Sequence, residues 1–205
     1  MGILDHVAIA AASLDEGVAH VEAALGVGLS PGGRHALMGT HNRLLSLGPG
    51  EYLEVIAIDP EAPVPAHPRW FALDAFLGPP TPRAWIVAVP DLGQAVTAAP
   101  EGMGRPMDFA RGDLTWRMAV PASGVLPFDG VFPALIAWEG AAHPAQRLPD
   151  QGVRLVAIRL THPRAGDLSA ALAGLLADDR VEVVEGPRAA LALGFDTPSG
   201  RRWLG

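Results

Sequence analysis

Stretches in which apolar and polar residues follow a strand pattern alternate with stretches in which they follow a helix pattern. One order of strand and helix recurs along the chain. Residues 6–10 form a short apolar run, and after Ser13 apolar side chains fall three or four residues apart, as on one face of a helix. Residues 85–96 repeat this pattern, and residues 155–172 repeat it more loosely. Repetition of this kind indicates duplicated structural units.

The predicted helices begin and end at residues with capping chemistry. Ser13 and Glu16 have the spacing of a capping box, and Asp91 with Gln94 offers a variant of it. Gly26 is placed to end the first helix. A stripe of leucines predicts the third helix: Leu168, Leu172, Leu175 and Leu176.

Strand-like segments follow the first two helices. Residues 44–47 and 52–58 flank a Gly-Pro-Gly turn and predict a hairpin, and residues 29–38 leave room for one more strand. Residues 114–120 and 131–138 take similar parts in the second half. Each half is therefore predicted as β-α-β-β-β, with a β-α-β-β tail, which belongs to the α+β class.

These patterns divide the chain into four segments of a single compact unit. We expect a first module over residues 1–60, a proline-rich extended connector over 61–82 and a second module over 83–140. Residues 141–205 are expected to form the C-terminal extension.

The composition removes several kinds of chemistry. The 205 residues include no cysteine, which excludes disulfide scaffolds, zinc fingers, iron–sulfur clusters and thiol nucleophiles. There is also no lysine, which excludes Schiff-base catalysis and a P-loop lysine. Among side chains that bind metals or carry protons, histidines and carboxylates are left as the main candidates.

The charge and the N-terminal sequence point to a cytoplasmic protein. The formal net charge is −7 and the arginines are scattered along the chain, which argues against a nucleic-acid partner. The first residues lack the basic region of a signal peptide, and no apolar run is long enough to span a bilayer. We therefore expect a bacterial, cytoplasmic protein with a small-molecule ligand and no membrane partner.

Several segments together resemble a known superfamily. They are Leu-Asp-His-Val-Ala-Ile-Ala at residues 4–10, Gly-Thr-His-Asn-Arg-Leu-Leu-Ser-Leu-Gly at 39–48, Tyr-Leu-Glu-Val-Ile-Ala-Ile-Asp-Pro at 52–60 and the tail at 153–163. In these the chain resembles the glyoxalase-like domain proteins of the vicinal oxygen chelate superfamily, over nearly its whole length. The resemblance implies paired βαβββ modules curled into a cup, in which the first and fourth strands can each supply a metal ligand. It also implies that homodimers are common.

His6 and Glu54 are the leading candidates for chemistry. In an extended strand His6 shares a face with Ala8 and Ala10, which leaves space above the sheet. Glu54 lies in an apolar run, where a carboxylate is costly unless it is paired, protonated or bound to a cation. The pair suits Zn, Mn, Fe or Ni, or could act without metal as a general base. A purely structural role stays open.

The second module does not supply the matching ligands. Alignment of the two halves brings Trp85 near the position of His6 and Ala134 opposite Glu54, and neither is a usable ligand. A third ligand would come from His35, His41 or His143, although the favoured interpretation of each is an ordinary loop or strand-edge histidine. The expected cofactor is therefore one divalent metal ion or none.

Other residues are candidates for shaping the ligand site. Trp85, Trp116 and Trp138 lie on predicted strands of the second module and could form an aromatic wall, or belong to an ordinary core. Arg117 could clamp a substrate carboxylate, or lie on a solvated face. Asn42 could donate to a substrate oxygen, or serve a turn.

Two functions remain open at this point, because fold and reaction are loosely coupled. The first is an enzyme of the lyase, isomerase or dioxygenase kind that acts on a small oxygenated metabolite in the cup through a His–Glu pair. The second is a protein that binds or sequesters a small molecule without chemistry. A structural protein with a vestigial site would have no pocket between the sheets.

Overall fold

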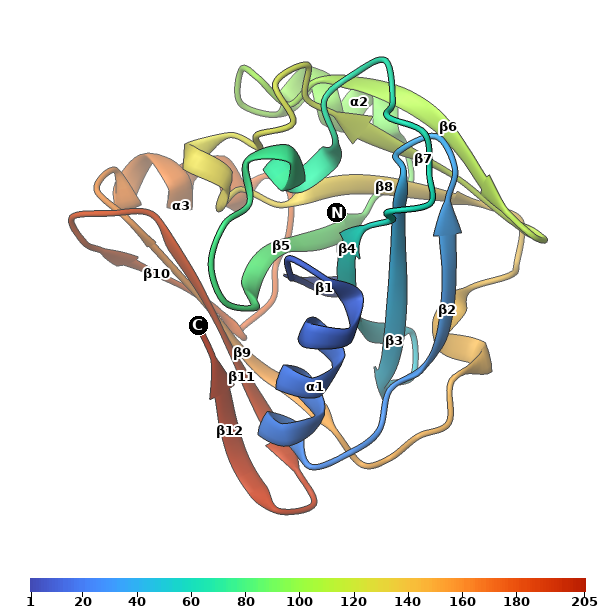
Figure 1. Cartoon of the computed structure of the whole chain (residues 1–205). Helices are drawn as coiled ribbons and strands as arrows, with labels where there is room; N and C mark the ends of the chain where they lie inside the picture. The colour runs from blue at the N-terminus through green and yellow to red at the C-terminus, as the bar shows by residue number, and fades with distance from the viewer.

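The largest element of the structure is a curled eight-stranded sheet (Figure 1). The computed structural model describes all residues from 1 to 205. The strand order is β2-β3-β4-β1-β5-β8-β7-β6. The bounds are β1 (Ile3–Ala10), β2 (Ser30–His35), β3 (Thr40–Gly48), β4 (Glu51–Ile58), β5 (Thr81–Ala88), β6 (Arg105–Arg111), β7 (Leu114–Val120) and β8 (Ala134–Glu139).

The sheet consists of two modules that meet along β1 and β5. Each module pairs its first and last strands in parallel, β1 with β4 and β5 with β8, whereas β1 and β5 pair antiparallel at the centre. Ala8 lies opposite Glu54 in the first module, and Ile86 lies opposite Ala134 in the second. The predicted fold class, paired βαβββ modules in a curled sheet with a C-terminal addition, is confirmed.

The helices α1 (Leu14–Leu25) and α2 (Leu92–Ala98) begin at the predicted caps. The Ser13 hydroxyl accepts from the Glu16 amide, and the Asp91 carboxylate accepts from the Gln94 amide. These contacts satisfy backbone donors that have no partner inside the helix. Gly26 ends α1 with a φ of 73°, a left-handed conformation that glycine adopts without steric cost.

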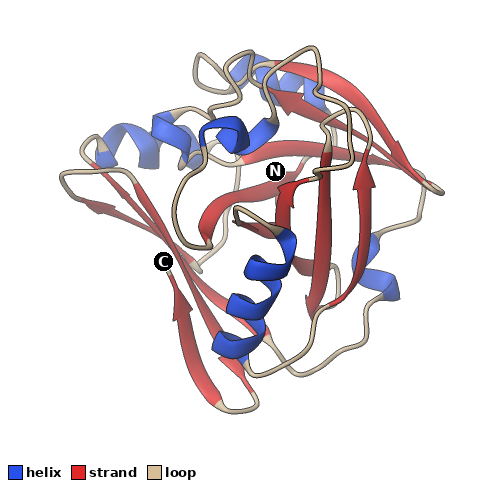
Figure 2. Ribbon diagram, viewed as in Figure 1, coloured by secondary structure: helices blue, strands red, loops and turns tan.

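The C-terminal segment forms a separate four-stranded sheet beside α1 (Figure 2). It comprises β9 (Arg154–His162), α3 (Ala165–Ala173), β10 (Val181–Glu185), β11 (Ala190–Thr197) and β12 (Gly200–Leu204). Three strands follow α3, one more than the sequence pattern predicted. Here β9 pairs in parallel with the strand that directly follows its helix, and the order is β10-β9-β11-β12. The segment therefore differs in topology from the two modules.

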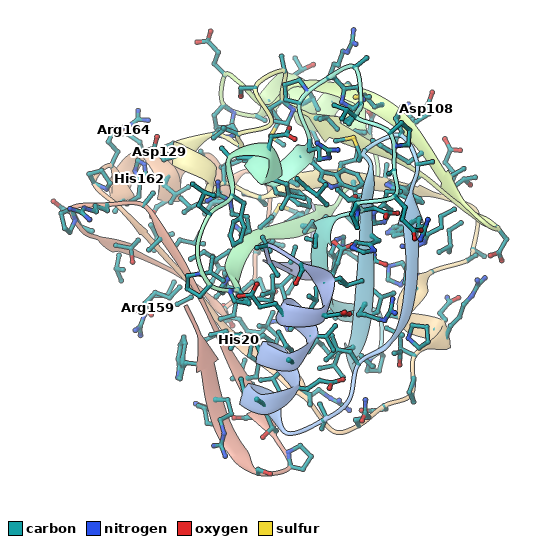
Figure 3. The ribbon with its side chains drawn as sticks, in the orientation of Figure 1. His20, Asp108, Asp129, Arg159, His162 and Arg164 are labelled. Atoms are coloured by element: carbon teal, nitrogen blue, oxygen red, sulfur yellow. The ribbon has the colours of Figure 1, made fainter.

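Polar contacts join the small sheet to the main one. His162 is buried and its Nε2 lies 3.2 Å from Asp129 Oδ2, while the Arg164 guanidinium lies over the Phe128 ring (Figure 3). Arg180 donates to both carboxylate oxygens of Glu51, at 2.7 and 2.8 Å. These contacts fix the extension against the modules.

Three short 3-10 segments complete the fold: η1 (Trp70–Ala75), η2 (Phe128–Gly130) and η3 (Pro144–Arg147). The first of them lies inside the connector that was predicted to be extended throughout. Trp85, Phe132 and Phe195 are among the largest fully buried side chains of the core. No helix has the length and apolar character that crossing a membrane requires.

The packing of α1 on β4 yields a stability prediction. A Cβ atom at Gly17 would lie 2.6 Å from a methyl group of Val55 and 2.7 Å from the Ala11 methyl group. We expect Gly17→Ala to lower the free energy of unfolding by about 1–3 kcal/mol through overpacking, despite the better helix propensity of alanine. Urea denaturation measures this change.

Gly166 in α3 provides the matched control, because a Cβ atom there meets nothing within 4 Å. Gly166→Ala is expected to leave stability unchanged or raise it by up to about 1 kcal/mol. A Gly17→Ala protein as stable as the Gly166→Ala protein would contradict the close approach of α1 to the sheet.

Candidate functional site

Polar side chains gather with aromatic rings on the concave face of the eight-stranded sheet. We call this site the cup. Its lining consists of His6, His35, Asn42, Tyr52, Glu54, Trp70, Phe71, Arg111, Trp116, Met118, Ile136 and Trp138. The cavity between them measures about 20 Å³, which accommodates about one water molecule. The cup is therefore closed in this structure.

A β-bulge in β1 brings two successive polar side chains together. Leu4 pairs with Val87 and His6 with Ile86, so Asp5 is an extra residue without a partner in the ladder. A bulge interrupts the alternation of faces and redirects the side chains beside it. As a result the Asp5 carboxylate reaches His6 Nδ1, with Oδ1 at 2.5 Å.

The Asp5 carboxylate is buried and has three donors. Besides His6, these are the Trp138 indole N–H at 2.8 Å and His143 Nε2 at 3.1 Å, both on Oδ2. Burial alone would raise the pKa of Asp5, but the hydrogen bonds from His143 and His6 and their positive charge when protonated hold it well below its usual value. Asp5 is therefore ionised and acts only as an acceptor.

An ionised Asp5 determines which nitrogen of neutral His6 carries the hydrogen. Nδ1 must donate to the carboxylate, so Nε2 presents its lone pair on the opposite edge of the ring. Glu54 Oε2 lies 3.8 Å from this Nε2. The Tyr52 ring stacks on the imidazole with centroids 4.4 Å apart and keeps its plane fixed.

Glu54 is held from the side of β3. The Asn42 side-chain amide donates to Glu54 Oε1 at 2.5 Å, and Asn42 Oδ1 in turn accepts from the Gly33 amide at 2.7 Å. These two bonds fix the orientation of the Asn42 amide group. Glu54 Oε2 therefore remains the oxygen that faces His6.

His35 and Arg111 form the opposite wall. An Arg111 N–H lies 3.1 Å from His35 Nε2 and 3.3 Å from Asn42 Oδ1. A guanidinium can only donate, so His35 Nε2 accepts, and Nδ1 donates to the Thr40 hydroxyl at 3.0 Å. Burial and the neighbouring Arg111 charge lower the pKa of His35 to about 4, so the ring is neutral at pH 7.

The residues Trp70–Ala75 of η1 contribute the roof of the cup through Trp70 and Phe71. Phe71 and Ala72 both have left-handed backbones, with φ of 58° and 53°, which costs free energy in residues other than glycine. Hydrogen bonds hold this roof segment down: Arg83 Nε donates to Phe71 O, and the Ala72 amide donates to Gly124 O.

The structure brings six of the sequence candidates to the cup: His6, Glu54, His35, Asn42, Trp116 and Trp138. Two others do not line it, and for each the structure shows the alternative interpretation, a core tryptophan at Trp85 and a solvated arginine at Arg117. Trp85 pairs with Val7, which faces away from His6, and its indole donates to Val131 O at 2.9 Å in the core. Arg117 lies on the outer side of β7, where it is 44% exposed beside Glu139.

The other two histidine candidates do not line the cavity. His41 precedes the cup residue Asn42 in β3 and therefore points to the opposite face of the sheet. His143 packs edge-on against the Tyr52 and Trp138 rings behind the cavity and contacts Asp5, and its Nδ1 accepts from the Ala145 amide. His35 alone of the three lies near Glu54, with Nε2 3.9 Å from Oε1.

The donors present do not fit the metal ion that the resemblance implies. No three histidine or carboxylate side chains converge as a ligand set. The third candidate nitrogen, His35 Nε2, is already bound by the Arg111 cation. Alignment of the N-caps Ser13 and Asp91 brings Ala84 to the position of His6, and the strand register brings Ala134 to that of Glu54.

Sequence reasoning missed Asp5 and six of the lining residues: Tyr52, Trp70, Phe71, Arg111, Met118 and Ile136. Strict alternation along β1 would turn the Asp5 side chain away from His6, and the bulge reverses this. Tyr52 shares a face with Glu54 two residues later, a signal that was available. The roof residues and Arg111 come from distant segments, and their approach depends on tertiary structure.

The buried neutral His35 yields a pH prediction. Its pKa falls from 6.5 in the unfolded chain to about 4 in the fold, so between these values the unfolded chain binds a proton that the folded protein does not. Unfolding free energy should therefore decrease as pH falls through this window, by up to about 3 kcal/mol. Urea denaturation at about pH 7 and about pH 4.5 measures the loss.

His35→Gln should flatten this pH dependence, because the glutamine amide does not titrate. His20→Gln is the control, since His20 is exposed on α1 (Figure 3) and should keep the wild-type slope. Equal slopes for His35→Gln and the wild type would show that His35 is not a buried neutral group.

Comparison with solved structures finds proteins that are similar to this chain. A hypothetical protein from Staphylococcus aureus is similar in structure, with a TM-score of 0.60, 11% identity, and coverage of 92% of this chain and 88% of that one. A methylmalonyl-CoA epimerase from Mycobacterium tuberculosis aligns with a TM-score of 0.44 and 21% identity, over 68% of this chain and 88% of that one.

A hypothetical protein from Bacillus halodurans C-125 aligns with a TM-score of 0.45 and 16% identity, over 69% of this chain and 96% of that one. No curated protein sequence matches the chain. The family profile described as glyoxalase-like domain matches residues 4–176, both modules and the start of the extension. The chain therefore belongs to the glyoxalase-like domain family.

Proposed function

We propose that the cup catalyses proton transfer at a carbon atom next to a carbonyl group, the step that isomerases and lyases of small oxygenated metabolites share. The observation that carries this proposal is the Asp5–His6 contact of 2.5 Å, which leaves His6 Nε2 as a free base on the cup side of the ring. Proton abstraction of this kind needs a positioned base with a pKa near neutrality, which imidazole supplies.

The contacts of His6 support a particular order of proton-transfer steps. His6 Nε2 takes the proton from the carbon, and the resulting imidazolium is stabilised by the buried Asp5 carboxylate at its other nitrogen. Glu54 Oε2, 3.8 Å from Nε2, lies within reach of a ligand held between the two groups and can carry a proton to or from a second atom. None of these steps uses a metal ion, since the histidine and carboxylate side chains of the cup do not fit one.

Entry of a metabolite requires the roof segment Trp70–Ala75 to move. A cavity of about 20 Å³ holds about one water molecule, far less than a substrate. The left-handed Phe71 and Ala72 make the closed conformation of this segment costly, whereas the hydrogen bonds of Phe71 O and the Ala72 amide and the burial of its apolar side chains oppose its release. Closure over the ligand would then exclude water from the reacting groups.

Hydrogen–deuterium exchange tests the proposal. Small ketones, aldehydes and thioesters are incubated with the protein in deuterium oxide, and loss of the proton next to the carbonyl is followed by ¹H NMR. We expect catalysed exchange in the wild type and a reduction of about 100-fold or more in His6→Gln. Asp5→Asn should also slow exchange, because it removes the charge that stabilises the imidazolium.

His20→Gln serves as the matched control, because this exposed histidine on α1 lies outside the cup. It should exchange at the wild-type rate. Exchange in His6→Gln as fast as in the wild type, or no exchange above the buffer rate with any of these compounds, would reject the proposal.

The aromatic wall favours a second candidate function, the binding or sequestration of a small molecule without chemistry. Trp116 packs against Phe109 and Trp138, with ring centroids 5.6 and 5.4 Å apart, and continues to Trp70 through Phe109 at 5.2 Å. Such a surface holds flat apolar ligands. This function predicts ligands that quench tryptophan fluorescence, bind equally well to His6→Gln and undergo no exchange.

A further inference from the structure

We infer that the Trp70 indole N–H and the Arg111 guanidinium form an oxyanion subsite, which takes the carbonyl oxygen of an uncharged ketone, aldehyde or thioester. The inference rests on the proposed function, because the subsite acts on the oxygen of the group from whose neighbouring carbon His6 removes a proton. It adds the chemical class of the substrate and the residues that stabilise its enolate.

Trp70 provides the first observation. Its side chain lines the cup and is only 4% exposed, yet its Nε1 is buried without any hydrogen-bond partner. A buried N–H that makes no hydrogen bond costs about 1–3 kcal/mol, so native proteins rarely leave one. An acceptor oxygen delivered by a ligand would supply the missing partner.

Arg111 provides the second observation. One of its terminal nitrogens donates to His35 and Asn42, which leaves further N–H donors of the same planar group available at the cavity wall. Its position is confined by Gly33, where a Cβ atom would lie only 2.5 Å from Arg111 Cδ. A confined cationic donor of this kind suits an oxygen that becomes negative during reaction.

His35 links the two donors. The Trp70 ring meets the His35 ring edge-on with centroids 5.0 Å apart, and Arg111 donates to the same imidazole. The neutral state of His35 allows this contact, since an imidazolium would repel the guanidinium. Because the cavity is so small, an oxygen atom within it lies close to the groups of both walls.

The charges of the site select an uncharged ligand. Two carboxyl groups, those of Asp5 and Glu54, lie in and beside the cup with only one guanidinium, that of Arg111, and this balance disfavours an anionic substrate. An uncharged carbonyl compound avoids this repulsion. When the C–H bond breaks, its proton goes to His6 Nε2 and its electron pair moves onto the carbonyl oxygen, so the net charge of the site does not change.

The probe for the experiment is 2,4-pentanedione, an uncharged dicarbonyl compound whose enolate is visible by its ultraviolet absorbance. Protein labelled with ¹⁵N at the indole nitrogens gives one signal for each of the five tryptophans, and Trp70→Phe assigns that of Trp70. We expect saturable enolate formation and a downfield shift of the Trp70 indole proton. Pyruvate, the anionic comparison, should bind at least tenfold more weakly.

Variants separate the subsite from the base. Trp70→Phe keeps the ring but removes the N–H, and it should lower the enolate fraction at least tenfold, as should Arg111→Met. The matched controls Trp203→Phe and Arg105→Met alter exposed side chains on β12 and β6 and should behave as the wild type. Circular dichroism establishes that each variant is folded.

The outcomes are distinct for the two proposals. The subsite is rejected if 2,4-pentanedione gives no saturable signal, if pyruvate binds better, or if Trp70→Phe and Arg111→Met form as much enolate as the wild type. His6→Gln should lose the enolate absorbance but keep the Trp70 shift. Enolate formation in His6→Gln equal to that of the wild type would reject the base and leave the subsite standing.

Discussion

The buried carboxylate of Asp5 is the constraint on which the arrangement of the cup depends. An ionised group removed from water must be surrounded by donors, and here β1, β8 and the segment before η3 each supply one. The same contacts determine the tautomer of His6, the position of the Trp138 ring and the path of the chain at His143. One bulge residue therefore couples the geometry of His6 to both modules.

The two modules have diverged around a common topology. The first supplies the polar groups His6, Glu54, Asn42 and His35, whereas the second supplies Ala134 at the position equivalent to Glu54 and aromatic side chains on β7 and β8. Arg111 is the exception, because it reaches from the edge strand β6 to the opposite edge strand β2 where the curled sheet approaches closure. The polar groups from the first module and the apolar surface from the second line opposite sides of the cup, and this arrangement suits a ligand with one reactive end.

The sequence predicts the parts of this structure that follow from local periodicity. The helix caps at Ser13 and Asp91, the β3–β4 hairpin and the placement of His6 and Glu54 on strands all depend on residues near in sequence. The bulge at Asp5 leaves no such signal, and a one-residue error in aligning the halves changed the face of β5 and brought Trp85 rather than Ala84 to the position of His6. Trp70 was not identified because it lies in the connector, where the prolines predicted only an extended chain.

The groups that destabilise the closed cup belong to the roof segment and not to the surroundings of Asp5. Three donors satisfy the Asp5 carboxylate, whereas the Trp70 N–H has no partner and the roof segment contains two left-handed residues. A ligand oxygen that engages Trp70 would offset one of these costs only while the roof is closed. Ligand binding would then favour closure because the closed state alone makes that contact, so the same residue that recognises the substrate would also exclude water from it.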